Sequence, residues 1–348
     1  MKILGMFPGQ GSQGVGMGRH LWEGFPAAAA VYEEASEAVG YDVRRLCSEG
    51  PPEELTRTDR AQVAVFVASV AAWRVLQAAC STDGPETAAA SIRSWVVVGH
   101  SLGDYSGLVA CGHLTFSDAL DVVVRRGEAM RRCSLENPGA MTAVLGLADT
   151  LVQAACENVP GVWPANFNSP GQVVISGALS ALEEAEAECT RRGAKKVVRL
   201  QVAGAFHSPL MAEAAKEVQR ALRKVKPAAS VDPCFYSSTE LSFPRVDEIV
   251  PMLVRQVTAP VRFAQAISQL TGGSIDMSAA EDGGPEGAVS PPRREGTTAA
   301  PPQFAVEIGP GRVLSGLVRK TVKGIPVVDT ESDSGLGRAI ERCGGRAG

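Results

Sequence analysis

The sequence predicts an α/β protein whose core holds a parallel sheet and carries a smaller inserted antiparallel unit. Short apolar runs alternate with longer stretches of helical spacing through most of the 348 residues, a pattern typical of strands joined by helices. One apolar run ends in a glycine-flanked serine at 99–103. Residues 139–202 follow a strand and helix order of their own, which indicates the inserted unit.

The composition is that of an ordinary globular protein, with 45% hydrophobic and 21% charged residues. A net charge of −4 gives no sign of a nucleic-acid-binding surface, and we expect no apolar run to span a membrane. The opening MKILGMFPGQ has too short an apolar run for a secretory signal. The eight cysteines form no C-x-x-C pair, so we expect reduced thiols of an intracellular protein and no metal site.

The first apolar run, residues 2–7, predicts a strand that leads into the glycine-rich turn FPGQGSQ at 7–13. A phosphate-binding loop is excluded, because neither G-K-[ST] nor G-x-G-x-x-G spacing occurs there. Two interpretations stay open: a plain strand-to-helix turn, or a loop whose backbone approaches a reacting group, with Gln10 as a polar contact. The next predicted elements are helices over 17–39 and 62–80 and a polar surface loop over 81–94.

The stretch 95–111 predicts a strand, a tight turn and a helix, with Ser101 on the turn. The four residues before Gly99 are bulky or β-branched, and helical spacing resumes at Leu102. Gly99 and Gly103 leave room at a strained elbow, so the Ser101 hydroxyl is expected to project over the end of the sheet. Free N–H groups at the helix start would face a developing oxyanion. The pattern favours a nucleophile over a structural glycine turn.

The chain after the serine completes both predicted units. Ser117 is expected to cap a helix over 118–133, whose four arginines are by default a solvated face. Residues 139–202 predict a β-α-β-β-α-β ferredoxin-like subdomain. Its elements are expected at 139–147, 149–159, 162–166, 173–176, 180–192 and 195–202.

The last third of the chain returns to the alternation of the core. Residues 272–302 lose all periodicity and predict a disordered insertion. We expect a core of 1–137 and 203–348 and a subdomain of 138–202. The other predicted elements are a helix from GAFHSPLM at 204–211 to about 225, strands over 234–237, 304–308 and 325–328, helices over 247–257, 262–270 and 312–322, and a Gly- and Arg-containing tail.

A serine nucleophile needs a general base, and the chain has four histidines. His20 lies within a helical pattern, His100 adjoins the serine on a turn where neighbouring side chains diverge, and His113 lies at a distant turn. His207 remains, in a loop at a strand end, where α/β sheets place their working residues. No acidic partner is obvious, so a dyad whose histidine is oriented by a main-chain carbonyl has equal standing with a triad.

In combination, the motifs resemble malonyl-CoA:acyl carrier protein transacylases of type II fatty-acid synthesis. The resemblance implies a hydrolase-like α/β core with an inserted ferredoxin-like subdomain. It also implies ping-pong transfer of malonyl from malonyl-CoA to the phosphopantetheine thiol of acyl carrier protein, by a monomer with no bound cofactor or metal and no nucleic-acid or membrane partner. The motifs are FPGQGSQ at 7–13, GHSLGDYS at 99–106, RRGEAM at 125–130, NFNSPGQVVISG at 166–177, GAFHSPLM at 204–211, RQVTAPVRF at 255–263 and EIGPGRVLSGL at 307–317.

The resemblance also implies the catalytic roles. Ser101 would attack the malonyl thioester, and His207, held by the main-chain carbonyl of Gln256, would take its proton. The main-chain N–H groups of Gln10 and Leu102 would form the oxyanion hole.

The same resemblance implies the residues that hold the substrate. Arg126 would pair with the malonyl carboxylate through two charge-assisted hydrogen bonds, which removes this arginine alone from the solvated face. Asn168 and Gln256 belong to the expected substrate site. Residues 204–207, GAFH, also resemble the malonyl-selective motif of related polyketide acyltransferases, in which the residue at the position of Phe206 would crowd a methyl branch, so we expect malonyl to be preferred over methylmalonyl.

Two departures from the family pattern stand out. Asp104 replaces the usual Glu with the same charge, so we expect little effect. The extra loops at 81–94 and 272–302 suggest a nuclear-encoded enzyme of a plastid stroma, of apicoplast or chloroplast type, with the cytoplasm of a GC-rich bacterium as the alternative. An acidic carrier would need a basic patch, for which the candidates are Arg131, Arg132, Arg191, Arg192, Lys195 and Lys196.

Three rival functions stay open at this point. A serine hydrolase of the same elbow type would release malonate to water. A catalytically idle carrier-binding scaffold would not be labelled by malonyl-CoA. An acyltransferase of polyketide synthesis would differ only in the carrier protein that it serves.

Overall fold

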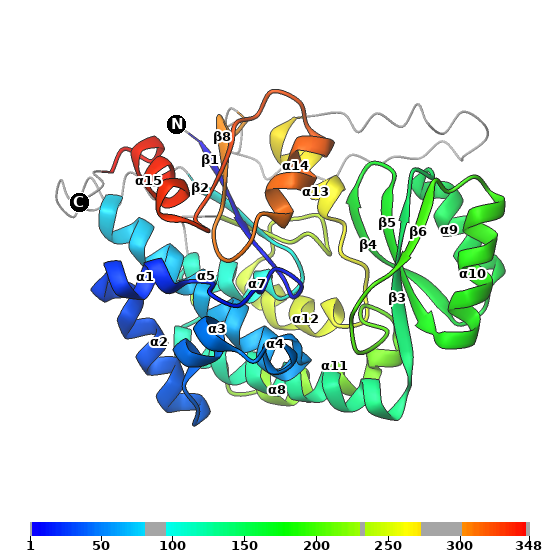
Figure 1. Cartoon of the computed structure of the whole chain (residues 1–348), viewed down its shortest axis with the longest axis horizontal. Helices are drawn as coiled ribbons and strands as arrows, with labels where there is room; N and C mark the ends of the chain where they lie inside the picture. Colours follow the sequence, from blue (N-terminus) through cyan, green and yellow to red (C-terminus); the bar gives the residue numbers. More distant parts are fainter. Residues whose placement is uncertain (1, 81–94, 230–233, 273–300, 346–348) are drawn as a thin grey trace.

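The computed structural model describes residues 2–80, 95–229, 234–272 and 301–345 (Figure 1). The predicted surface loop at 81–94 and nearly all of the predicted insertion at 272–302 lie outside these residues.

The core is built on a five-stranded parallel sheet in the order β7-β2-β1-β8-β9 (Figure 1). Strands β1, β2 and β8 are buried at every residue, as expected for parallel strands covered on both faces. Side chains alternate between the two faces: Ile3 and Phe7 join one apolar cluster, and Leu4 and Met6 join the other. The strands are β1 (Ile3–Phe7), β2 (Trp95–Gly99), β7 (Cys234–Tyr236), β8 (Phe304–Glu307) and β9 (Val327–Asp329).

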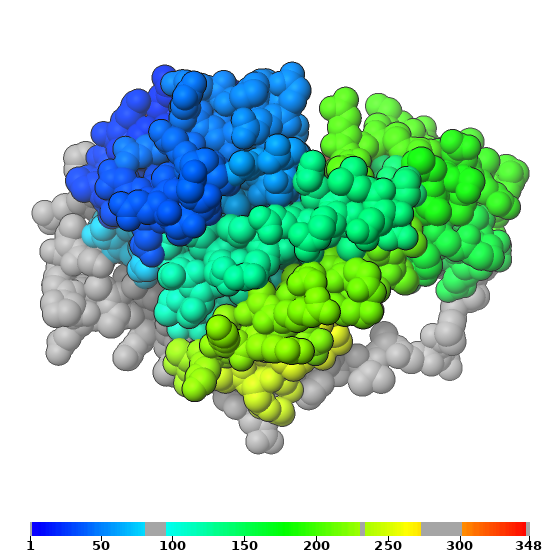
Figure 2. Space-filling model, turned by 90° about the horizontal axis from the view of Figure 1, so that it is seen from below, coloured from blue at the N-terminus to red at the C-terminus, as the bar shows by residue number. Residues whose placement is uncertain are grey.

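Helices cover both faces of this sheet. The face of the sheet that bears Leu4 and Met6 has the smaller helical layer, formed by α13 (Phe263–Thr271) and α14 (Val313–Thr321). Figure 2 shows α8 on one face of the molecule, between the N-terminal helices and α11. The larger side has α1 (Arg19–Gly24), α2 (Pro26–Val39), α3 (Val43–Glu49), α4 (Pro52–Thr56), α5 (Thr58–Cys80), α7 (Gly103–Ala110), α8 (Phe116–Glu136), α11 (Ala212–Leu222) after a short 3-10 turn (Pro209–Met211), α12 (Val246–Gln256) and α15 (Asp333–Arg342).

Helix α5 corrects one expectation. Among the described residues it is the one helix that is long and apolar enough to cross a membrane by length and composition, whereas the sequence analysis expected no such run. It is 72% buried over its apolar window, because it lies between other helices and the sheet. A helix that is apolar on all sides is typical of such an interior position.

The ferredoxin-like prediction is confirmed. The second sheet has the order β4-β5-β3-β6 with antiparallel neighbours, and α9 and α10 share an apolar cluster with it. This unit lies to one side of the core (Figure 1), and its boundaries at 138 and 202 stay a prediction. Its elements are β3 (Gly139–Leu145), α9 (Asp149–Asn158), β4 (Val162–Ser169), β5 (Gln172–Ala178), α10 (Leu179–Arg191) and β6 (Lys196–Arg199).

Two helix assignments were wrong. Helix α8 is capped by Thr115 rather than Ser117: the Thr115 hydroxyl accepts a hydrogen bond from the Asp118 N–H at 3.0 Å. No helix was predicted in the Gly- and Arg-containing tail after β9, yet it contains α15 with Ser332 as its cap. Two glycines hide its apolar spacing, and Gly335 is needed because a Cβ there would lie 2.5 Å from the Asp329 carboxylate.

Candidate active site

The turn between β2 and α7 holds Ser101 in a left-handed conformation, with φ of 54°. Few residues other than glycine adopt this conformation, and it persists where the surroundings enforce it. A Cβ at Gly99 would lie 2.2 Å from the Asp104 nitrogen, and one at Gly103 would lie 2.0 Å from the Phe7 oxygen. Both glycines are therefore required by close backbone contacts, as the elbow prediction supposed.

The glycine-rich loop after β1 packs directly on this elbow. Strands β1 and β2 are in parallel register with Phe7 opposite Gly99, and the His100 N–H donates to the Phe7 carbonyl at 3.0 Å. A Cβ at Gly9 would lie 2.5 Å from the His100 oxygen. Of the two open interpretations of the loop, the structure favours a close approach of its backbone to the elbow.

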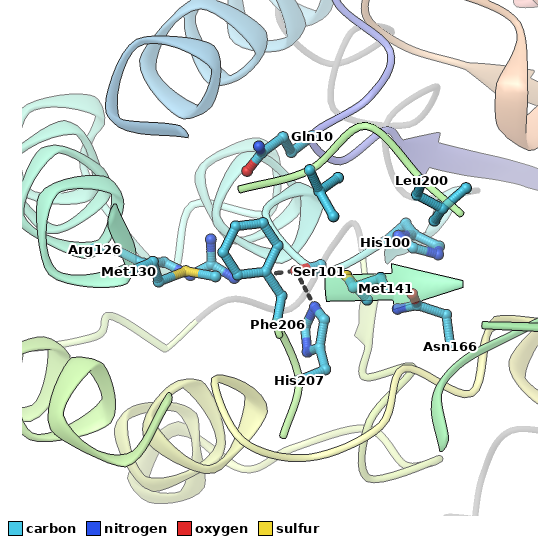
Figure 3. Close-up of a pocket in the computed structure, with 11 residues that line it drawn as sticks. Gln10, His100, Ser101, Arg126, Met130, Met141, Asn166, Leu200, Phe206 and His207 are labelled. Carbon is cyan, nitrogen blue, oxygen red and sulfur yellow. Dashed lines mark hydrogen bonds between the residues drawn. The ribbon is translucent and has the colours of Figure 1, made fainter. Parts of the chain in front are cut away.

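A pocket opens between this loop, the elbow and the subdomain (Figure 3). Gln10 and Ser101 both line it. In the part of the chain that the structure describes, the main-chain N–H groups of Gln10 and Leu102 have no hydrogen-bond partner. Two free N–H groups beside a nucleophile are what an oxyanion hole requires.

His207 lies against Ser101, with 2.7 Å between its Nε2 and the serine Oγ (Figure 3). Its Nδ1 is 3.0 Å from the Gln256 carbonyl and 3.1 Å from the Ala259 carbonyl. Carbonyls only accept, so Nδ1 carries the proton and the Nε2 lone pair faces the hydroxyl. Within the described ranges no carboxylate is bonded to this ring, which favours the dyad over the triad.

The environment of His207 keeps its ring neutral. Burial, the Arg126 cation and His100 lower its pKa to about 3. A neutral ring is the form that can accept the serine proton, so the base is ready across the physiological pH range.

Arg126 reaches the same serine from α8. It is 1% exposed, because it lies on the apolar face of α8 with Val122, Val123 and Met130. Its Nη2 donates to the Ser101 Oγ at 3.0 Å, and its Nη1 donates to the Gln62 Oε1 at 2.6 Å. Burial lowers its pKa, while Tyr105 and Asp104 raise it; a guanidinium stays charged in such a site.

Of the other three expected substrate residues, one lines the pocket and two do not. Phe206 lines the pocket. Gln256 does not line it: this residue is fully buried behind Ser101, to whose carbonyl its Nε2 donates at 2.8 Å. Asn168 does not line the pocket either, because its Oδ1 lies 2.9 Å from the His100 Nε2, and Asn166 takes the place expected of it.

Several residues of the site were not predicted from the sequence. Gln62 is one, and its signal was a long polar side chain among the apolar residues of α5. Pocket-lining side chains from the subdomain and its connections carried no such signal, because their distance from Ser101 depends on how the two units pack. These missed lining residues are Met141, Asn166, Leu200 and Val202, and Met130 of α8 in the core was missed as well. Among the described residues, no group of three or more His, Cys, Asp or Glu side chains could hold a metal ion.

Comparison with known proteins identifies the family. The family model of the acyl transferase domain matches residues 6–279. The malonyl CoA-acyl carrier protein transacylase of Escherichia coli K12 is 34% identical over 97% of this chain and 98% of its own length, and that of Bacillus subtilis strain 168 is 36% identical over 95% of each. This chain belongs to the malonyl-CoA:acyl carrier protein transacylase family. It is an acyltransferase.

Solved structures of the family agree. The transacylase of Coxiella burnetii superposes with a TM-score of 0.84 at 29% identity, covering 99% of this chain and 98% of that one. A malonyl-transacylase solved with its type II polyketide acyl-carrier protein gives a TM-score of 0.83 at 32% identity, covering 98% of this chain and 100% of that one. The hydrolase-like α/β core with an inserted ferredoxin-like subdomain is thereby confirmed as the fold class.

Proposed function

We propose that the chain transfers malonyl from malonyl-CoA to the phosphopantetheine thiol of acyl carrier protein through a malonyl ester of Ser101, and so supplies units for type II fatty-acid synthesis. The observation that carries this mechanism is the convergence of one base and one cation on one hydroxyl. Ser101 Oγ lies 2.7 Å from the His207 Nε2 and 3.0 Å from the Arg126 Nη2.

In the first half-reaction, Ser101 Oγ attacks the thioester carbonyl while its proton passes to His207 Nε2. The carbonyl oxygen becomes an oxyanion that accepts from the N–H groups of Gln10 and Leu102. The tetrahedral intermediate then collapses, the carbon–sulfur bond breaks, and the leaving sulfur of CoA takes the proton back. In the second half-reaction the carrier thiol gives its proton to His207 and its sulfur attacks the ester carbonyl. The bond from the carbonyl carbon to the Ser101 Oγ then breaks, and the serine oxygen takes the proton back from the His207 Nε2.

Arg126 binds the free carboxylate of the malonyl group in this scheme. Its position supports a three-carbon diacid, because the carbonyl and carboxylate carbons of malonyl are only about 2.5 Å apart across one methylene. A cation that contacts the nucleophile itself can reach a carboxylate at that spacing. It also anchors the acyl group so that water finds no ordered path to the ester, which separates this reaction from hydrolysis.

The surface that would bind the acyl carrier protein is expected to be basic. Arg191 and Arg192 pair with Glu188, and Arg131 lies 3.8 Å from Asp59. These pairs leave Lys195, Lys196 and Arg132 of the expected patch as the cations better able to meet an acidic carrier.

The enzyme is expected to act as a monomer. The bacterial relatives support the bacterial cytoplasm as its location more than the plastid.

The decisive experiment is intact-protein mass spectrometry after brief exposure to malonyl-CoA. The native chain is expected to gain one malonyl group and to lose it again on addition of phosphopantetheinylated carrier protein. Ser101→Ala should gain none. Rapid release of free malonate without carrier would identify a hydrolase instead, and an unlabelled native chain would support the scaffold.

A further inference from the structure

Asp104 lies directly behind the nucleophile and is fully buried. Its main-chain N–H donates to the Ser101 carbonyl at 3.0 Å. Its side-chain Oδ2 accepts a hydrogen bond from the Gln256 Nε2. Asp104 therefore contacts Ser101 directly through its main-chain N–H. Its side chain contacts Gln256, which in turn donates to the Ser101 carbonyl.

Gln256 is the residue that joins the parts of the site. Its Nε2 also donates to the Ser101 carbonyl at 2.8 Å, its main-chain carbonyl faces the His207 Nδ1 at 3.0 Å, and its Oε1 accepts from the Arg126 Nη2 at 3.4 Å. A shift of this one residue would move the nucleophile, the base and the cation together.

An ionised carboxylate accepts hydrogen bonds and cannot donate them. Facing Asp104, the Gln256 amide must turn its NH₂ group toward the carboxylate and the Ser101 carbonyl, and its oxygen then faces Arg126. The opposite amide orientation would set the Gln256 oxygen against two acceptors. The carboxylate at 104 therefore acts together with the Ser101 carbonyl and Arg126 to hold one orientation of the amide.

We propose that Asp104 is a positioning residue of the malonyl transfer reaction, which orients Gln256 and through it keeps Ser101 in its left-handed conformation and His207 in line with the hydroxyl. The proposal rests on the proposed function, because Ser101 is the nucleophile in both. It agrees with the expectation that an Asp in place of Glu has little effect, and it gives the carboxylate itself a role, since the residue is part of a buried hydrogen-bond network rather than a surface charge.

The charge on Asp104 can change near neutral pH, which provides a readout beyond rate. Burial raises its pKa to about 7, while the Gln256 hydrogen bond and the Arg126 cation act in the opposite direction. Arg126 and the Tyr105 phenol are the charged or titratable groups that interact with it. His207, with a pKa of about 3, does not titrate in the same range.

The test compares Asp104→Asn with Asp104→Glu, using the rate at which malonyl-CoA acylates Ser101 as a function of pH. The asparagine is neutral, so the charge-assisted hydrogen bond that helps to hold the Gln256 amide is lost, and we expect the acylation rate constant to fall at least about 10-fold with little change in half-saturating malonyl-CoA. In the native chain the acylation rate is expected to fall as the pH drops below about 7, because Asp104 becomes protonated. This acidic limb of the pH profile should disappear in the asparagine variant. Asp104→Glu, which keeps the charge, should restore both the rate and the limb.

Native rates and an unchanged pH profile in Asp104→Asn would overturn the proposal, as would a glutamate variant no better than the asparagine one. If Asp104→Asn does not fold, Gln256→Met removes the same hydrogen bond from the other side and should show the same loss of rate. A native rate in that variant would again overturn the proposal. Failure of the proposed function looks different: the native chain itself would then form no malonyl adduct on Ser101.

Discussion

The Arg126 Nη2 lies 3.0 Å from the Ser101 Oγ, so a fixed cation contacts the nucleophile before any substrate is bound. The cation has two consequences. It stabilises negative charge that develops on the serine oxygen during attack, and it adds to burial, the larger cause, in lowering the pKa of His207. The same guanidinium is the expected partner of the malonyl carboxylate, so activation of the serine and selection of the acyl group depend on one side chain.

Arg126→Ala is expected to reduce kcat/KM for malonyl-CoA by about 100-fold or more, because a buried charge-assisted pair is lost. Uncharged acetyl-CoA should lose less, since it makes no such pair and loses only the contribution of the cation to the attack by Ser101. Arg126→Lys is the matched control: it keeps a point charge but not the two-pronged geometry, and it should recover only part of the malonyl rate. Acyl transfer to carrier protein with each thioester measures both effects. Equal losses for the two substrates would contradict the assignment.

Gly9→Ala is expected to lower the free energy of unfolding by about 2 kcal/mol or more and to slow acylation, since the new Cβ would lie 2.5 Å from the His100 oxygen. Gly14→Ala, in the same segment, is the control, because a Cβ there meets nothing within 4 Å. Denaturant unfolding and the acylation rate should separate the two variants. Equal stability and rate would show that the loop tolerates displacement from the elbow.

Phe206→Ala is expected to admit methylmalonyl-CoA, which the native protein should transfer poorly. The ring is 5% exposed and lines the pocket beside the base, where a methyl branch would need space. Discrimination by the bulk of one side chain is usually worth roughly 10- to 200-fold. Competition between the two thioesters, read out as the mass of the acyl-enzyme, gives the ratio. Comparable labelling by both in the native chain would count against this role.

Asp104→Asn is expected to change how stability depends on pH. The folded-state pKa of this carboxyl is raised to about 7, mainly by burial, so folding is favoured at low pH and that advantage is lost as pH rises from about 4 to about 7. The asparagine variant lacks this loss, and the native chain should lose up to about 4 kcal/mol relative to it over that range. Chemical unfolding of both proteins at the two ends of the range measures the difference. Parallel pH dependence would contradict the raised pKa.

Much of the fold follows from local pattern. The strand before Ser101, the helix after it and the six elements of the subdomain fall within a few residues of their predicted places, because burial on both faces and helical spacing leave clear periodic signals. Helix α15 was missed because glycine interrupts its apolar spacing. The cap of α8 was misplaced because Thr115 and Ser117 are both suitable cap residues, and only the backbone conformation distinguishes them.

The sequence by itself determined that a serine sits on a glycine-flanked elbow and that His207 is its expected base, and the family resemblance of its motifs added Arg126. Only the tertiary structure decided that Gln256 contacts Ser101, His207 and Arg126, that Asp104 accepts a hydrogen bond from its amide, and that Asn166 rather than Asn168 lines the pocket. The physical reason is the sequence separation over which each kind of interaction acts. Periodicity and turn chemistry act between residues a few positions apart, whereas His207 meets Ser101 across 106 positions through the packing of separate elements.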